Sequence, residues 1–202
     1  MSGVCGNIRG EKLLALVFPS AARISKIPSA VGRGEGRALF FIFILFITLT
    51  GVTIHLMRIP REQRSGLRVV EVFLLYFLSV QWGFGGIATA LPHILTPDYV
   101  AGYIGWQKGS PFQVELGFAA LGLSVIATLC IWIRGVFWWA PAIGFSVFLY
   151  GAAYVHFREI AAHGNFSPGN AGIPLVFDLI IPTVVLGLCI TYARLGGFRN
   201  AA

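Results

Sequence analysis

Apolar residues occur in five long runs along this chain of 202 residues. The runs lie at about 38–57, 69–91, 113–133, 136–156 and 173–193. A helix needs about 20 apolar residues to cross a hydrocarbon core of roughly 30 Å, and each run reaches that length. A transmembrane barrel would instead need short segments of alternating hydrophobicity, which the sequence does not show. The pattern therefore predicts an all-α, polytopic integral membrane bundle with about five transmembrane helices.

Composition and charge agree with a membrane protein. Hydrophobic residues make up 56% of the chain and charged residues 11%, far from the balance of a soluble domain. The formal net charge is +7, yet the basic residues are spread over loops and termini and form no stripe interleaved with aromatic residues. We therefore expect membrane lipids as partners and no nucleic acid. Three scattered cysteines do not form a disulfide framework.

The two ends of the chain and the connecting loops differ from the apolar runs. Residues 1–37 are predicted to form a basic extramembrane tail, and residues 194–202 a short C-terminal tail. With five spans, the loops 92–112 and 157–172 lie on one side of the membrane. The other side has more basic residues: Arg58, Arg61, Arg64, Arg68, Arg134, Arg194 and Arg199 against Lys108 and Arg158. This bias favours that other side as cytoplasmic, although the basic N-terminal tail opposes it.

Three of the eight acidic residues, Glu71, Glu115 and Asp178, lie inside predicted spans. An ionised carboxylate at the centre of a bilayer costs roughly 2.5 to 3.5 kcal/mol, so such residues usually contact partners, water or a ligand. Glu71 follows Arg68 by three positions, and an ion pair at the membrane interface accounts for it. The other two acids need a different explanation.

The third run begins at a helix-capping pattern. Ser110 is followed by Pro111 and Gln113, which is typical of a capping box with proline at the first helical position. Glu115 would then lie about 7 Å along the helix axis from the cap. The positive end of the helix favours a carboxylate at that position.

The fifth run has a similar arrangement. Pro174 lies near its first helical position, and Asp178 follows four residues later. Pro182 has no N–H to donate to the carbonyl of Asp178, which frees that carbonyl within the helix. Asp178 therefore presents a carboxylate and a free backbone oxygen together.

His156 ends the fourth run on the same side of the membrane. We therefore expect Glu115, His156 and Asp178 to meet at one level, just beneath the loops 92–112 and 157–172. Gln113 and Asn170, from the borders of these loops, are further candidates for this polar site. Ser110, Pro111, Pro182, Arg68 and Glu71 are assigned structural roles.

Three interpretations of Glu115, His156 and Asp178 stay open at this point. They could form hydrogen bonds between helices without any activity, a ligand or substrate site, or a metal site. Two carboxylates and a histidine suit iron, manganese or zinc. However, no pair has a short ligand spacing such as His-x-x-x-His, so we predict no metal and assign no cofactor.

Two sequence signatures resemble a family of uncharacterised bacterial multi-pass membrane proteins. The first runs from Gly105-Trp106 through Gly109-Ser110-Pro111-Phe112-Gln113 to Glu115. The second runs from Asn165 through Pro168-Gly169-Asn170-Ala171-Gly172 to Asp178 and Pro182. The resemblance covers about residues 70–193 and implies a bacterial cytoplasmic (inner) membrane protein without an assigned activity. The chain is also similar, at the level of fold only, to DoxX-like membrane proteins.

Two classes of function fit these observations. The sequence shows no soluble catalytic module, so we expect an accessory or packing subunit of a larger membrane complex or a binder of a lipophilic small molecule. The alternative is a membrane enzyme that acts on a lipid or quinone-like substrate by carboxylate and histidine acid–base chemistry, or a proton-coupled carrier.

Overall fold

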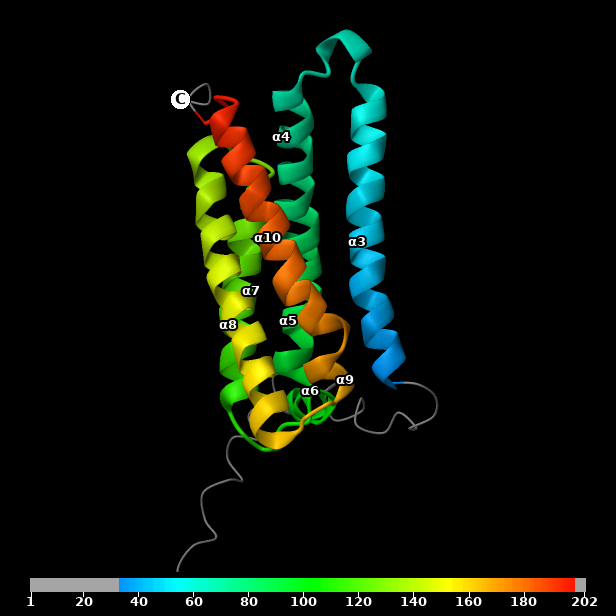
Figure 1. Ribbon diagram of the computed structural model, residues 1–202, viewed down its shortest axis with the longest axis vertical. Coiled ribbons are helices and arrows are strands. Elements are labelled where there is room, and N and C mark those ends of the chain that lie inside the picture. Colours follow the sequence, from blue (N-terminus) through cyan, green and yellow to red (C-terminus); the bar gives the residue numbers. More distant parts are fainter. Residues whose placement is uncertain (1–32, 199–202) are drawn as a thin grey trace, which may run out of the picture. The chain divides into compact units, whose positions relative to one another are not determined.

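A computed structural model describes residues 33–198, and these residues form helices and connecting turns without strands (Figure 1). Within these described residues, five helical stretches are long and apolar enough to cross a membrane, which confirms the predicted all-α fold. They are α3 (Arg33–Arg58), the continuous unit of α4 (Gly66–Tyr76) and α5 (Gly85–Leu95), α7 (Phe112–Leu129), α8 (Trp139–His163) and α10 (Ile173–Arg194). Residues 33–37 of the expected basic tail belong to α3, and residues 1–32 and 199–202 lie outside the described part.

A π-helical segment, Phe77–Phe84, joins α4 to α5. Ser65 begins this long unit by accepting a hydrogen bond from the backbone N–H of Arg68, at 3.2 Å. Gln81 lies in the π-helical segment, is buried, and has its Oε1 3.2 Å from Thr48 Oγ1 of α3. π-helical turns are rare and often lie at functional sites. The second span is thus wound irregularly where it carries a buried amide.

Two short helices cover one end of the bundle. Both lie in segments that the sequence indicated only as loops, α6 at Pro97–Ile104 and α9 at Pro168–Ala171. They lie side by side below α5 and α10 in Figure 1, next to the end of α8. Asn165 Nδ2 donates to the backbone oxygen of Ile104 at 3.0 Å. The two loops therefore form one joined cover.

The fourth span continues past its predicted end at residue 156. Helix α8 ends at His163, where Gly164 adopts a left-handed conformation (φ 61°) and caps it. A short 3-10 helix, Gly135–Trp138, leads into its beginning. His156 consequently lies about two turns inside the helix rather than at its end.

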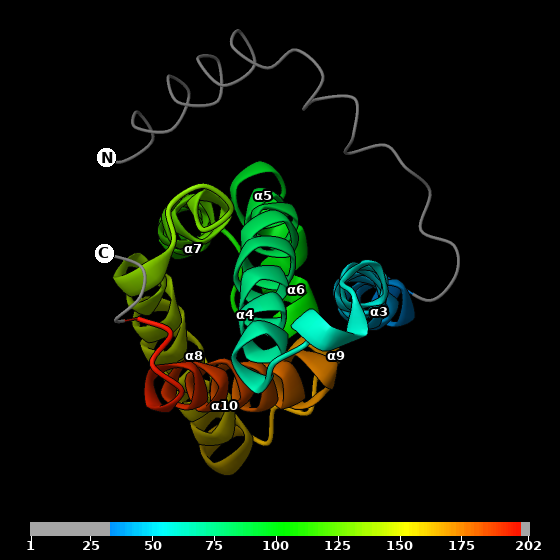
Figure 2. The same cartoon turned by 90° about the horizontal axis from the view of Figure 1, so that it is seen from above.

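Helices α4, α5, α7, α8 and α10 surround a common interior, and α3 stands beside α4 (Figure 2). The interior is filled with side chains in the half where α4 begins and α10 ends. The core there includes Trp138, Leu74, Leu78 and Val185, each fully buried, and Trp82 stacked on Phe145 with ring centroids 4.9 Å apart. The other half of the interior is lined differently and contains the site described below.

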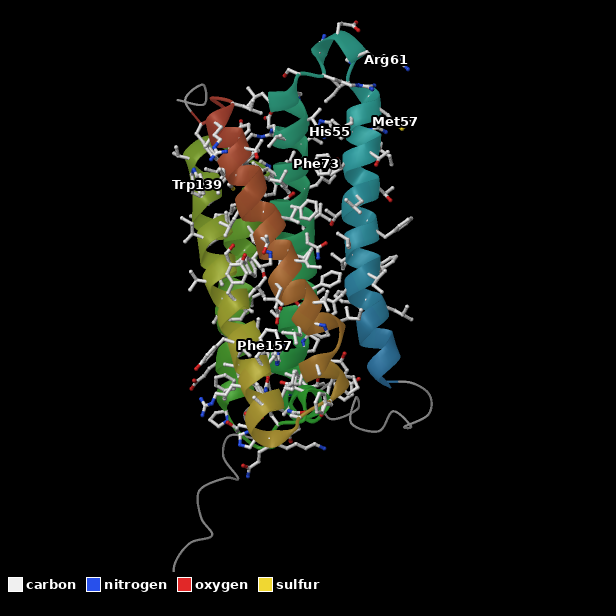
Figure 3. All side chains as sticks on the ribbon, viewed as in Figure 1. His55, Met57, Arg61, Phe73, Trp139 and Phe157 are labelled. Carbon is white, nitrogen blue, oxygen red and sulfur yellow. The ribbon has the colours of Figure 1, made fainter. Side chains whose placement is uncertain are left out.

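Helix α3 contacts the bundle along one side only. Figure 3 shows His55 of α3 and Phe73 of α4 in the seam between the two helices, whereas Met57 points away. His55 also lies against Tyr76, with ring centroids 5.7 Å apart. The outward residues of α3 are large and apolar, and Met57 is 72% exposed. Such a surface is what lipid chains would cover.

Candidate functional site

A cavity of about 580 Å³ lies in the half of the bundle next to α6 and α9. Residues of α3, α5, α6, α7, α8, α9 and α10 line it. Most of the lining is apolar, and it includes Phe40 and Phe41 of α3 and Phe148 and Leu149 of α8. The polar lining residues are Thr89, His93, Tyr103, Trp106, His156 and Asp178. Ligand cavities in proteins have this size and this mixture of many apolar and few polar groups.

His156 of α8 is buried and is held by Asn170 of α9. Its Nδ1 lies 2.7 Å from Asn170 Oδ1. The Asn170 amide nitrogen donates twice, to the backbone oxygens of His156 at 3.2 Å and Asn165 at 2.8 Å. Because Oδ1 is thus the accepting end of the amide, His156 Nδ1 carries a hydrogen. This bond fixes the imidazole so that its Nε2 is available on the other side.

Asp178 of α10 lies on that other side. Its Oδ2 is 3.6 Å from His156 Nε2, and the Asp178 side chain is 13% exposed. At this distance the two groups form an ion pair when His156 is protonated.

Pro182 lies inside the continuous helix α10, where it was expected to free the carbonyl of Asp178. Pro182 is a buried residue inside this helix. Since proline has no N–H, the Asp178 carbonyl lacks its usual donor one turn later. Asp178 also lines a second, smaller cavity of about 70 Å³ together with Gln81. The carboxyl group thus lies where the two cavities approach each other.

Trp106 forms part of the cavity wall beside His156. The two rings are stacked with centroids 6.2 Å apart, and Trp106 also lies 5.8 Å from the ring of Phe112. Gly105 (φ 83°) ends α6 and turns the chain toward this position. A Cβ on Gly105 would lie 2.6 Å from Asn165 Oδ1, so only glycine allows the two loops to meet there.

Gln113 takes part in a different contact from the one predicted. Its Oε1 lies 2.8 Å from His93 Nδ1 of α5, and Gln113 is buried. Ser110 Oγ instead accepts from the backbone N–H of Phe112 at 3.2 Å, and Pro111 directly precedes the first helical residue. The predicted capping box is corrected in this respect: the glutamine side chain joins α7 to α5 because His93 lies within its reach.

Glu115 does not join His156 and Asp178. Its side chain is exposed and lies outside the cavity lining. The Glu115 side chain forms no hydrogen bond or ion pair within residues 33–198. Two positions along a helix rotate a side chain by about 200°, so the inward direction of Gln113 turns Glu115 outward. The expected group of Glu115, His156 and Asp178 is therefore corrected to the pair of His156 and Asp178.

Glu71 forms an ion-pair cluster at the opposite end of the bundle. Its Oε2 lies 2.6 Å from Arg68 Nη1, the pair predicted from their spacing. Its Oε1 also lies 3.2 Å from Arg134 Nη1, which the sequence did not indicate. Glu71 thereby links α4 to the turn between α7 and α8. Its role is structural.

The chemistry of the site rests on few titratable groups. In the part of the chain that the structure describes, no three His, Cys, Asp or Glu side chains gather in a metal-binding geometry. Sequence reasoning missed Thr89 as a lining residue, whereas His93 was recognised as lying on the same side as His156 and Asp178. Thr89 and His93 are one helical turn apart on α5, a spacing that could have indicated a shared face.

The fold and the site together define a class: an integral membrane protein with five apolar helices and a buried histidine–carboxyl pair on the wall of a largely apolar cavity. The chain belongs to the family of unknown function DUF6790, whose family model matches residues 38–197. This agrees with the expectation of an uncharacterised family. No curated protein and no solved structure matches the chain.

Proposed function

We propose that this protein binds a lipophilic small molecule in the cavity of about 580 Å³, with the polar end of the molecule at His156 and Asp178. The observation that supports this most is the position of the pair on a largely apolar wall. An apolar lining stabilises a lipophilic molecule by removing its surface from water or headgroups, while a few placed polar groups orient it. The similarity to DoxX-like proteins stays a prediction and carries no part of this proposal.

Paired substitutions on α7 test the proposal. Ala120 lines the cavity and Ala119 is exposed, so Ala120→Leu fills the cavity and Ala119→Leu is its matched control. Each variant is purified in lipid nanodiscs, extracted with organic solvent and analysed by mass spectrometry. We expect a lipophilic molecule to copurify with the wild type and with Ala119→Leu, and its amount to fall at least about fivefold in Ala120→Leu, because about 1 kcal/mol of lost binding suffices for this change.

Equal amounts in both variants, or no bound molecule in any sample, would contradict ligand binding. A stoichiometric partner protein without a small molecule would favour the accessory-subunit hypothesis instead. The same preparation therefore separates these two functions.

A second candidate is a membrane enzyme, and the order Asn170–His156–Asp178 favours it. A histidine oriented at one nitrogen and placed near a carboxyl group at the other is an arrangement used for proton transfer. In that case Asp178→Asn would retain the bound molecule but stop its conversion. A change in the mass of an added, labelled copy of the copurified molecule, seen with the wild type only, would show this activity.

We propose that the cavity lies in the outer half of a bacterial cytoplasmic membrane. Basic residues gather at the end of the bundle away from the cavity, at the end of α3, the start of α4 and the end of α10: Arg58, Arg61, Arg64, Arg68 and Arg194. Such a bias favours that end as cytoplasmic. Labelling of cysteines introduced at exposed Gln63 and exposed Lys108 with a membrane-impermeant reagent tests this orientation, because only the Lys108 position should react in intact cells.

A further inference from the structure

The charges around the cavity restrict the polar end of its ligand. Among the lining residues that the structure describes there is no lysine or arginine, and Asp178 is the one acidic residue. His156 Nε2 faces Asp178 Oδ2 at 3.6 Å, so a protonated His156 compensates the charge of the Asp178 carboxylate. Among the described lining residues, an added anion would meet no lysine or arginine, and it would lie close to the carboxyl group of Asp178. Burial of such an uncompensated charge is costly.

Asp178 has an oxygen left for a ligand. Its Oδ2 faces His156, and its Oδ1 takes part in no hydrogen bond within residues 33–198. On α5, the Thr89 hydroxyl already donates to the backbone oxygen of Gly86 at 2.9 Å, so toward the cavity Thr89 offers lone pairs. Asp178 Oδ1 and Thr89 Oγ1 both accept hydrogen bonds. A ligand group that donates a hydrogen bond would therefore fit beside these two oxygens.

A protonated amine would donate but would also add a charge. With His156 protonated, Asp178 is already compensated, and the charge of the amine would have no counter-charge among the described lining residues. Binding of an amine would then require His156 to lose its proton, and it would strengthen as the pH rises, up to the pKa of the amine itself. An uncharged hydroxyl donates without any such exchange.

We infer that the polar end of the ligand is an uncharged hydroxyl group, as in a long-chain alcohol or a phenol, whose O–H is donated to Asp178. The inference rests on the proposed function and specifies the chemical class of the ligand. The hydrophobic part of the ligand lies along the apolar wall that Phe41, Phe148 and Leu149 contribute.

Three probes with the same chain and different polar ends test this inference: decanol, decanoic acid and decylamine. Thermal unfolding of the full-length protein in lipid nanodiscs is measured with each probe, for the wild type and for Ala120→Leu. Partition of the probe into the lipid affects both proteins alike. The difference between their shifts in unfolding midpoint therefore measures binding in the cavity. A ligand that binds the folded state raises the unfolding midpoint in proportion to the logarithm of its occupancy.

We expect the dissociation constant of decanol, derived from this difference, to be at least tenfold lower than those of decanoic acid and decylamine at neutral pH. The dissociation constant of decanol should also be unchanged at mildly alkaline pH. Tighter binding of the acid, or amine binding that matches the alcohol and strengthens with pH, would overturn the assignment of a hydroxyl and leave the proposed function intact. If none of the probes distinguishes the wild type from Ala120→Leu and no lipophile copurifies, the proposed function itself fails.

Discussion

Asn170 holds His156 at both its side chain and its backbone. Asn170 Oδ1 lies 2.7 Å from His156 Nδ1, and Asn170 Nδ2 donates to the His156 carbonyl at 3.2 Å. Asn170 is fully buried on a helix of only four residues, so α9 is fastened to α8 through this one side chain. The contact determines which imidazole nitrogen faces Asp178, and with it the chemistry of the cavity wall.

Replacement of Asn170 should therefore destabilise the protein and disturb the site. Asn170→Ala removes the contact to the His156 ring and leaves the buried carbonyls of His156 and Asn165 without this donor. We expect a loss of at least about 2 kcal/mol in the free energy of unfolding, because each unpaired buried group costs about 1 to 3 kcal/mol. The measurement is thermal unfolding in nanodiscs, with exposed Gln63→Ala as the control. An equal, small effect of both variants would count against the anchoring role.

The two acids of the predicted trio should respond differently to the same chemical change. Glu115→Gln alters an exposed side chain without described partners, so we expect stability to change by less than about 0.5 kcal/mol. Asp178→Asn alters the partner of His156. In a double-mutant cycle with His156→Gln we expect a coupling energy of about 1 kcal/mol, within the range for residues in contact.

The control for this cycle is the combination of Glu115→Gln with His156→Gln, whose effects should simply add. Additive effects of the Asp178 and His156 substitutions would mean that the pair does not interact in the membrane. A coupling energy between Glu115 and His156 would instead support the group of Glu115, His156 and Asp178 that the sequence indicated.

Loss of Glu71 should leave two arginines close together at the opposite end of the bundle. Both partners, Arg68 and Arg134, are partly exposed, so the ion pairs are screened by water and salt. We expect Glu71→Gln to lower stability by about 1 kcal/mol at low salt and by less at high salt. Glu62→Gln, an exposed acid of the neighbouring turn, is the control and should have little effect. A salt-independent loss would point to packing rather than charge.

The contact between the two covering helices should not tolerate a methyl group. A Cβ at Gly169 of α9 would lie 2.5 Å from the ring of Tyr103 and 2.8 Å from its backbone oxygen, whereas a Cβ at Gly187 of α10 meets nothing within 4 Å. We expect Gly169→Ala to lower the unfolding midpoint by several degrees, since a clash with backbone is not relieved by side-chain rotation.

Gly187→Ala should leave the midpoint equal or raise it, because alanine has the higher helix propensity. Equal midpoints of the two variants would show that α9 can move away from α6. Gly169 also lines the cavity, so Gly169→Ala should reduce the copurified lipophile as well.

The positions of the spans and of the polar residues near them were accessible from sequence because they depend on local chemistry. The length of each apolar run is set by the thickness of the bilayer, and the Arg68–Glu71 pair by the helical repeat. The same repeat could have shown that Gln113 and Glu115 do not share a face of α7. The expectation for Glu115 used its depth along the helix, which matches that of Asp178, and not its direction, and the structure therefore corrected it.

The sequence by itself determined the membrane class, the five apolar helices and the approach of His156 to the level of Asp178. Only the tertiary structure decided which partners these residues have: Asn170 for His156, His93 for Gln113 and Arg134 for Glu71. The reason is physical. Apolar periodicity indicates which residues are buried, and buried polar atoms indicate where a hydrogen-bond partner is required. Neither pattern identifies the partner residue. The cavity is likewise a result of the tertiary structure. Side chains fill the interior of the bundle at the end away from α6 and α9 and leave it open at the end that these two helices cover.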